Sequence, residues 1–256
     1  QATVWSDITN TTAFKDATYP FPVVTAVSRQ PNQVQIHLNV TYVEYTPFEF
    51  GSWQPTLQAF IPIGSLGSAL DNGQPSAKDK TCISGYENFG WVVGSSSTVF
   101  NQAYIKVLKS KKVIYKIVEP ILKAMDKGHD DVAEVPNPFI GYRTDTNHFA
   151  KEQYLSLADG GEANHTIPLE PLVQPSRSLD MLVAVDAGQD INPPGWPNGF
   201  SLRRMADRIQ LDKFKYMSFP HIPDGNTFVN QGLNTRPTFF GCDLNKDSII
   251  NYDSAI

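Results

Sequence analysis

Two short apolar runs, each ending in an acid, are the clearest hydrophobic pattern in the chain. Residues 154–158 lead into Asp159, and residues 181–185 lead into Asp186. Short continuous apolar runs bounded by turn residues are typical of buried strands. The pattern therefore predicts an α/β protein whose central sheet carries residues 155–158 and 181–185 as neighbouring or near-neighbouring buried strands.

Asp159 is followed at once by Gly160 and Gly161. We expect these glycines to turn the backbone sharply, because glycine reaches a positive φ without a Cβ clash. The carboxylate would then be presented at the carboxyl end of a strand, where open α/β sheets bind ligands. Asp-Gly is also a common turn dipeptide, so a plain strand-to-loop turn is the alternative.

Three further segments carry strand or loop patterns. Alternation of apolar and polar residues over 34–42 predicts a half-buried strand, and residues 45–53 predict an extended segment broken at Pro47. Residues 89–94 predict another short strand. Residues 127–138 are acidic and then proline-rich, which predicts an exposed loop.

Apolar residues at three- and four-residue spacing predict helices within residues 100–108, 114–125 and 202–214. Basic side chains are spread around the other faces of the last of these helices. Charge runs are usually solvated, so we expect these side chains to face solvent: Arg203, Arg204, Arg208, Lys213 and Lys215.

Composition narrows the classes of protein that fit. A chain of 256 residues with 41% hydrophobic and 18% charged residues can bury one sizeable core, so we expect a single domain over residues 1–256. The net charge of -5 gives no basic bias, and no nucleic-acid partner is expected. No apolar run approaches the ~20 residues that a membrane-spanning helix needs.

No metal or other cofactor is expected. The two cysteines and five histidines show no zinc-ligand spacing. Asp243, Asn245 and Asp247 begin like a calcium-binding loop, but Ser248 stands where such a loop requires glycine, so the match is attributed to chance. Cys82 and Cys242 could form one disulfide, pair with other cysteines or stay free.

Several motifs follow one another in a fixed order along nearly the whole chain. They are Phe48-Glu49-Phe50-Gly51-Ser52-Trp53, Gly94-Ser95-Ser96-Ser97, Pro136-Asn137-Pro138-Phe139, Asp159-Gly160-Gly161-Glu162, Trp196-Pro197-Asn198-Gly199 and Arg236-Pro237-Thr238-Phe239-Phe240-Gly241-Cys242. Together they resemble the second half of a fungal phospholipase B (lysophospholipase), whose catalytic domain is related to cytosolic phospholipase A2 and, more distantly, to patatin. The resemblance implies a central mixed sheet flanked by helices.

The resemblance also implies hydrolysis of fatty-acyl esters of lysophospholipids and phospholipids at a membrane or micelle surface, without a cofactor. In that family an aspartate followed by two small residues belongs to a Ser-Asp dyad, and Asp159 matches it. Gly160 and Gly161 would lie against the substrate. Arg177 matches an arginine thought to place the phosphate, although a surface arginine is the alternative.

The nucleophile is expected outside this chain, because no serine lies in a Gly-x-Ser-x-Gly elbow. In the family that elbow lies further toward the N-terminus. We therefore expect this chain to be the C-terminal portion of a longer protein and to be inactive alone. Ser96 is a weaker substitute, since its segment suits a helix N-cap, and the resemblance gives His165 no part.

Three sequons suggest a secreted or cell-surface glycoprotein. We expect glycans on Asn10 and Asn39, but not on Asn164, where a glycan would crowd the proposed active-site loop.

Two alternatives to the hydrolase stay open. The first is a non-catalytic remnant or binding module built on half of the phospholipase fold. The second is an unrelated carbohydrate-acting enzyme that uses Asp159 and Glu162 as its two carboxylates.

Overall fold

The structure is a computed structural model that describes residues 3–31, 33, 37–98, 132–191 and 195–242. The chain divides into two compact units: Gln1–Ile36 with Val40–Glu162, and His37–Asn39 with Ala163–Ile256. The expectation of a single domain over residues 1–256 stays a prediction. The helices expected within residues 100–108 and 114–125 lie outside the described residues.

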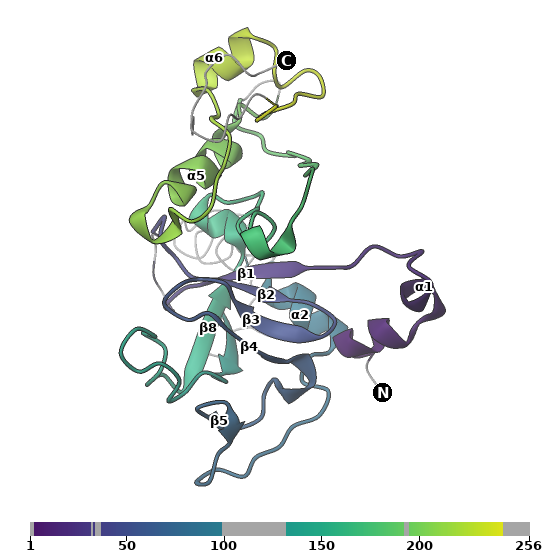
Figure 1. Ribbon diagram of the computed structural model, residues 1–256, viewed down its shortest axis with the longest axis vertical. Coiled ribbons are helices and arrows are strands. Elements are labelled where there is room, and N and C mark those ends of the chain that lie inside the picture. Colours follow the sequence, from purple (N-terminus) through teal and green to yellow (C-terminus); the bar gives the residue numbers. More distant parts are fainter. Residues whose placement is uncertain (1–2, 32, 34–36, 99–131, 192–194, 243–256) are drawn as a thin grey trace, which may run out of the picture. The chain divides into compact units, whose positions relative to one another are not determined.

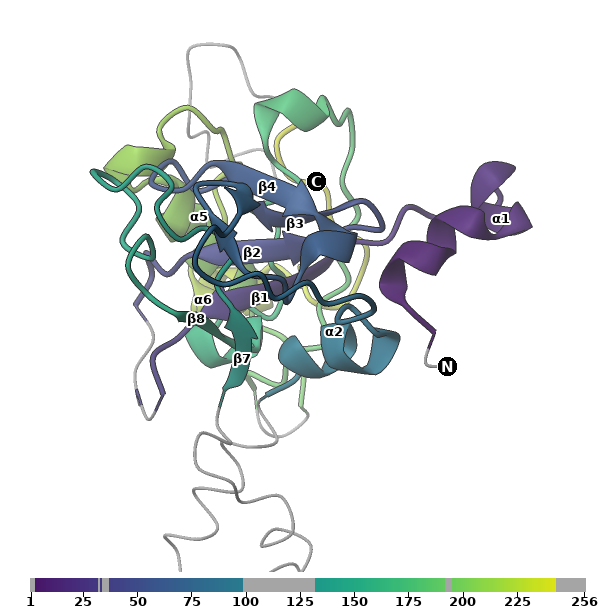
Figure 2. The same ribbon diagram turned by 90° about the horizontal axis from the view of Figure 1, so that it is seen from below.

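Unit 1 is built on a six-stranded sheet with the strand order β4-β3-β2-β1-β8-β7 (Figure 2). All five pairings in this sheet are antiparallel. The strands are β1 (Val24–Ser28), β2 (Tyr42–Tyr45), β3 (Glu49–Ser52), β4 (Ala59–Pro62), β7 (Ala133–Pro136) and β8 (Tyr154–Ala158). Both sequence-adjacent and distant segments thus meet in one sheet, and β8 lies inside it rather than at an edge.

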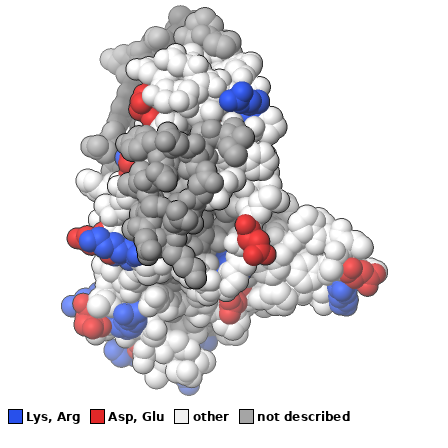
Figure 3. Space-filling view, turned by 45° about the horizontal axis from the view of Figure 1, so that its top comes forward, with Lys and Arg blue, Asp and Glu red and all other residues white. Residues whose placement is uncertain are grey.

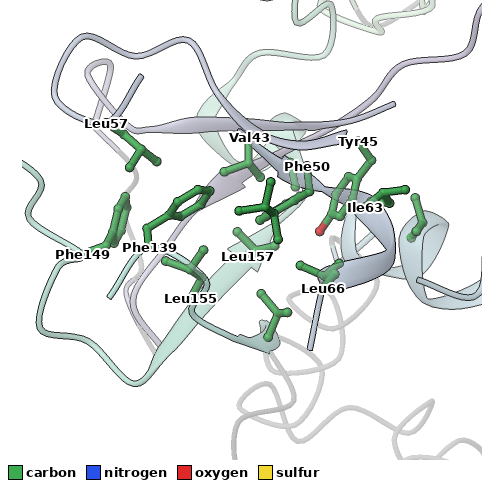
Figure 4. Close-up of a cluster of buried hydrophobic side chains, with 14 of the residues drawn as sticks. Val43, Tyr45, Phe50, Leu57, Ile63, Leu66, Phe139, Phe149, Leu155 and Leu157 are labelled. Carbon is green, nitrogen blue, oxygen red and sulfur yellow. The ribbon is translucent and has the colours of Figure 1, made fainter. Parts of the chain in front are cut away.

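The core of unit 1 contains side chains from β2, β3, β7 and β8 and from the segments that follow β3, β4 and β7 (Figure 4). Phe50, Leu157 and Val135 are each fully buried, with 0% of their surface exposed. The rings of Phe50 and Phe139 stack with centroids 6.1 Å apart. Burying a large apolar side chain stabilises a fold by roughly 1.5–3 kcal/mol, so this cluster is the main source of stability for the sheet.

Gly51 is required where β3 and β4 approach each other. A Cβ atom at this position would lie 2.2 Å from the carbonyl oxygen of Ala59 on the neighbouring strand. The next residue, Ser52, donates a hydrogen bond from its Oγ to the carbonyl oxygen of Tyr42, at 2.5 Å. The expected break at Pro47 is confirmed, because Pro47 lies in the turn between β2 and β3.

Short helices complete unit 1: η1 (Trp5–Asn10), α1 (Thr12–Lys15), η2 (Ile63–Ser65) and α2 (Phe89–Ser95). A two-stranded ribbon pairs β5 (Leu70–Asp71) with β6 (Gln74–Pro75). Figures 1 and 2 both show α1 at the end of an arm that leaves the sheet. Phe14 on that arm contacts Phe48, in the β2–β3 turn, with ring centroids 6.0 Å apart.

Unit 2 consists of short helices around a small apolar cluster. Its helices are η4 (Pro175–Arg177), α5 (Phe200–Ile209), η5 (Asp212–Phe214) and α6 (Gly225–Asn230). Ala206, Ile222, Phe228 and Leu233 form the cluster. The helix expected within residues 202–214 is thereby confirmed as α5, followed by the single turn of η5.

A buried ion pair adds to the interior of unit 2. Arg208 donates from Nε to Glu170, and both side chains are at most 2% exposed. Arg208 also donates from Nη1 to the carbonyl oxygen of Leu38, and Lys213 donates to that of Asn39 at 2.8 Å. The side chains of Arg208 and Lys213 thus bind residues 37–39 to the rest of unit 2 through backbone carbonyl oxygens. The expectation that Arg208 faces solvent is wrong, because its charge is balanced inside the unit by Glu170.

Four expectations about elements need correction. Residues 89–94 form helix α2, not a strand: the Asn88 side chain caps it by accepting from the Trp91 N–H, at 2.9 Å. Residues 133–136 form strand β7 rather than an exposed loop, since they pair with β8. Residues 37–40 are not a strand, because Leu38 and Asn39 make a turn. Val34 and Ile36 lie outside the described residues.

The fourth correction concerns residues 181–185, which do not form a buried strand. The side chains of Met181, Val183 and Val185 are 72%, 77% and 83% exposed. Among the described residues, no backbone hydrogen bond reaches residues 179–187. The run also belongs to unit 2, whereas β8 belongs to unit 1.

Candidate active site

Asp159 is placed by the end of strand β8, as the sequence predicts. Ala158 is fully buried and lies opposite Val27 on β1, and β7 pairs with the other edge of the strand. Asp159 follows directly and is half-buried. Its position is therefore fixed by two neighbouring strands, so the carboxylate projects from a rigid part of the sheet.

The turn after Asp159 is closed by the aspartate itself. Oδ1 accepts a hydrogen bond from the Gly161 N–H at 2.7 Å, and the carbonyl oxygen accepts one from the Glu162 N–H at 3.0 Å. The chain then runs into the 3-10 helix η3 (Gly160–Ala163). Within the described part of the chain, Oδ2 receives no hydrogen bond, and this oxygen remains available for a hydroxyl group.

The expected role of the two glycines needs correction. Neither Gly160 nor Gly161 adopts a positive φ. The sharp turn comes instead from the aspartate side chain, which caps the backbone two residues further on. Gly160 is buried and Gly161 is partly exposed.

Burial raises the pKa of the Asp159 carboxyl above its usual range, and the hydrogen bond from Gly161 opposes this rise. Desolvation disfavours the charged form of a carboxylate. A carboxylate with a raised pKa is a better proton acceptor than a free aspartate, whose pKa is near ~3.9.

Three further residues hold the turn: Thr98, Arg29 and Glu162. Sequence reasoning did not predict Thr98 or Arg29 here, and it considered Glu162 only as the second carboxylate of a carbohydrate-acting enzyme. Thr98 Oγ1 accepts a hydrogen bond from the Asp159 N–H at 2.9 Å and donates one to Glu162 Oε1 at 2.7 Å. Glu162 Oε2 lies 3.2 Å from Arg29 Nη1, and both of these side chains are 1% exposed. Thr98 precedes Asp159 by 61 residues, so no local pattern could have found it.

This arrangement weakens the carbohydrate-enzyme alternative. That alternative needs Glu162 as a second working carboxylate beside Asp159. Both oxygens of Glu162 are instead engaged by Thr98 and Arg29 inside the protein.

The serines considered as substitutes for a nucleophile have other partners. Ser96 Oγ donates to the carbonyl oxygen of Thr25 at 2.6 Å. Ser201 Oγ accepts from Thr166 Oγ1 at 2.8 Å and from the Ile167 N–H at 3.1 Å. Ser201 is also buried, with 4% of its surface exposed. Both hydroxyl groups are therefore engaged in hydrogen bonds within the protein.

Arg177 and His165 belong to unit 2, whereas Asp159 belongs to unit 1. Arg177 ends the short helix η4 and is partly exposed. His165 is buried rather than a solvated loop residue, with 1% exposed. Burial, followed by the nearby charges of Arg208 and Arg204, lowers the pKa of His165 to about 3, so its ring is neutral at neutral pH.

The three sequon asparagines Asn10, Asn39 and Asn164 are all exposed. Exposure permits glycosylation, and the expected pattern of modification stays a prediction.

Cys82 and Cys242 are exposed free thiols. On the face shown in Figure 3, charged side chains lie scattered among uncharged ones.

No group of three histidine, cysteine, aspartate or glutamate side chains suited to a metal ion occurs among the described residues. Asp243, Asn245 and Asp247 lie outside them. Nor do the described helices include one long and apolar enough to cross a membrane.

Comparison with known proteins decides the family. Residues 1–254 match the model of the lysophospholipase catalytic domain. The chain belongs to this family. It is 42% identical over 245 residues to lysophospholipase 3 of Aspergillus fumigatus, covering 93% of this chain and 38% of that protein. It is 39% identical over 255 residues to lysophospholipase 1 of Saccharomyces cerevisiae, covering 97% of this chain and 38% of that protein.

The fold of this lysophospholipase-family chain resembles that of human GIVD cytosolic phospholipase A2. The TM-score is 0.68 at 14% identity, and the match covers 95% of this chain and 36% of that one. The expected family and fold class are thereby confirmed. The chain spans well under half the length of these relatives.

Proposed function

We propose that this chain supplies the general base of an ester hydrolase that releases fatty acids from lysophospholipids and phospholipids, with Asp159 as that base. The geometry of Asp159 carries the proposal. It follows a strand paired on both sides, its Oδ1 is held by Gly161 at 2.7 Å, and burial raises its pKa. Family membership supports the same class of substrate.

The proposed reaction has two steps. A serine hydroxyl attacks the acyl carbonyl, Asp159 takes the hydroxyl proton, and the leaving alcohol receives that proton as the acyl-enzyme forms. Water then attacks the acyl-enzyme, again giving a proton to Asp159, and the fatty acid leaves with the serine restored. The serine is proposed to come from a segment outside this chain, because no Gly-x-Ser-x-Gly elbow occurs in its sequence.

Arg177 is proposed to bind the phosphate of the substrate, since its planar guanidinium suits a bidentate contact with phosphate oxygens. Gly160 and Gly161 are proposed to lie against the substrate beside Asp159. The full protein is proposed to act on lipid at a membrane or micelle surface, as a secreted or cell-surface glycoprotein with glycans on Asn10 and Asn39.

A serine-reactive fluorophosphonate separates this proposal from a non-catalytic remnant. We expect the full-length gene product to be labelled on one serine and to hydrolyse lysophosphatidylcholine, while residues 1–256 alone are neither labelled nor active. Absence of labelling and of hydrolysis in the full-length gene product would support the remnant. Labelling of Ser96 in residues 1–256 would instead place the nucleophile in this chain.

Substitutions in the full-length gene product then test the roles. Asp159→Asn keeps the shape of the side chain but cannot accept the proton, so kcat should fall about 10²–10⁴-fold. Arg177→Ala should raise KM more for lysophosphatidylcholine than for a neutral monoglyceride. His165 has no assigned role, so His165→Gln should lower kcat far less than Asp159→Asn. If His165→Gln lowers kcat more than Asp159→Asn, a histidine-based mechanism would replace the dyad.

A further inference from the structure

The turn that presents Asp159 is bound to a buried chain of three side chains from three separate segments. Arg29 follows β1, Thr98 follows α2, and Glu162 lies in η3. Thr98 is 3% exposed, and the side chains of Arg29 and Glu162 are each 1% exposed. This chain of contacts is called the Arg29–Glu162–Thr98 relay below.

The direction of each hydrogen bond in the relay is fixed by chemistry. A backbone N–H can only donate, so Thr98 Oγ1 accepts from the Asp159 N–H, at 2.9 Å. The single hydroxyl proton of Thr98 is then donated to Glu162 Oε1, at 2.7 Å. The ion pair with Arg29 Nη1, at 3.2 Å, favours the charged form of Glu162, whose two oxygens can then only accept.

Arg29 also connects the relay to strand β8. Its backbone N–H donates to the carbonyl oxygen of Ser156 at 2.9 Å, just beyond the pairing of Val27 with Ala158. The same residue therefore holds the strand before Asp159 through its backbone and the turn after Asp159 through Glu162. Removing one partner of a buried charged pair is costly, so we expect all members of the relay to stay in place in the folded protein.

From this geometry we propose that Thr98, Glu162 and Arg29 are positioning residues for Asp159. The relay fixes the backbone at Asp159, and the side chain closes its own turn on Gly161, so the relay sets where Oδ2 points. The inference rests on Asp159 being the proposed base. A displacement on the order of 1 Å in a catalytic group can cost ~10²-fold in rate, so loss of the relay should reduce kcat without any loss of contact to substrate.

Thr98→Val and Thr98→Ser form the decisive pair. Valine matches the shape of threonine but removes both hydrogen bonds of Oγ1, whereas serine keeps the hydroxyl. In the full-length gene product, Thr98→Val should lower kcat about 10–100-fold with KM changed less than about threefold, and Thr98→Ser should stay within about threefold of the parent. Ser96→Ala is the matched control, because its hydroxyl bonds Thr25 and not the Asp159 turn.

The pH profile distinguishes positioning from general destabilisation. In the proposed mechanism the acid limb of kcat/KM reports Asp159, so Thr98→Val should move that limb while Thr98→Ser should leave it in place. Equal loss of kcat in Thr98→Val and Thr98→Ser would overturn the inference. So would a folded Thr98→Val protein with the kcat and pH profile of the parent.

A measurement on residues 1–256 keeps the inference separable from the proposed function. Carboxyl-carbon NMR of Asp159 and amide exchange at Asp159 should change in Thr98→Val and be restored in Thr98→Ser. This arm does not need catalysis. If the NMR changes appear but Asp159→Asn keeps full activity in the gene product, then the relay positions the turn and the function proposal fails. Unchanged NMR in a folded Thr98→Val chain would refute the relay itself.

Discussion

Strand β8 and the run at residues 181–185 carry nearly the same local sequence signal but have different structures. Each is apolar, and each ends in an Asp-x-Gly turn. Asp159 Oδ1 accepts from Gly161 at 2.7 Å, and Asp186 Oδ1 accepts from Gly188 at 2.8 Å. β8 is nevertheless paired on both edges, whereas residues 181–185 are mostly exposed and have no ladder partner in the described part of the chain. The local sequence is sufficient to predict both turns. Whether an apolar run forms a strand depends on neighbouring strands, which β8 has in β1 and β7.

The comparison is tested most strongly by amide hydrogen exchange on residues 1–256. Amides of β8 that are bonded in the ladder open with free energies approaching global unfolding, ~5 kcal/mol or more, so they should exchange about 10³-fold or more slowly than unprotected amides. Amides of residues 181–185 should exchange at nearly unprotected rates. Equal protection of the two runs would mean that residues 181–185 are paired in solution, and the contrast would disappear.

A pair of leucine truncations compares the side chains of β8 with those of the exposed segment that begins two residues before Met181. Leu157 on β8 is 0% exposed and Leu179 is 53% exposed. Leu157→Ala should lower the free energy of unfolding by about 2–5 kcal/mol, through lost burial and a residual cavity. Leu179→Ala should change it by no more than about 0.5 kcal/mol. Urea unfolding followed by far-UV circular dichroism measures both, and similar costs would show that Leu179 is buried in solution.

The smallest effect concerns the two aspartate turns. The pKa of Asp159 is raised in the folded state, so its contribution to stability is full below the unfolded pKa of ~3.9 and is lost as the pH rises through the folded pKa. Asparagine cannot ionise but still accepts from Gly161. Asp159→Asn should therefore raise the urea midpoint at pH 7 relative to the parent, and the difference should vanish near pH 3.

Asp186→Asn is the matched control at pH 7, because it keeps the cap on Gly188 in a turn that follows an exposed run. It should change stability by no more than about 0.5 kcal/mol. Two outcomes would contradict the argument that burial destabilises the ionised form of Asp159. One is a stabilising effect of Asp186→Asn, and the other is a stability gain from Asp159→Asn that is smaller at pH 7 than at pH 3. A stabilising effect of Asp159→Asn at pH 7 would also show that the ionised carboxylate lowers the free energy of unfolding.

The parts of the fold that sequence could predict are those set by local chemistry. The continuous apolar run predicted β8, the three- and four-residue spacing of apolar residues predicted α5, and Pro47 predicted the break between β2 and β3. The same reasoning misread residues 89–94, because aromatic and β-branched residues favour strands while the Asn88 cap and one-sided burial of Val92 favour a helix. Residues 133–136 looked like a loop because their strand exists only through pairing with β8.

The candidate site divides in the same way. Asp159 was predictable, since an acid after an apolar run and before two glycines is visible in the sequence. Thr98 and Arg29 were not, because they reach the turn from 61 residues away and from the end of another strand. A threonine in a serine-rich stretch and an arginine after a strand carry no local sign of such contacts.

The turn at residues 37–39 has a consequence for how the protein is made. Its carbonyl groups are bound by Arg208 and Lys213, which lie 170 and 174 residues later in the chain. At a translation rate of ~5–20 residues per second, Arg208 and Lys213 are synthesised about 10–35 s after this turn. An early segment that must stay open for that time is one on which a chaperone could act while the ribosome completes the remainder.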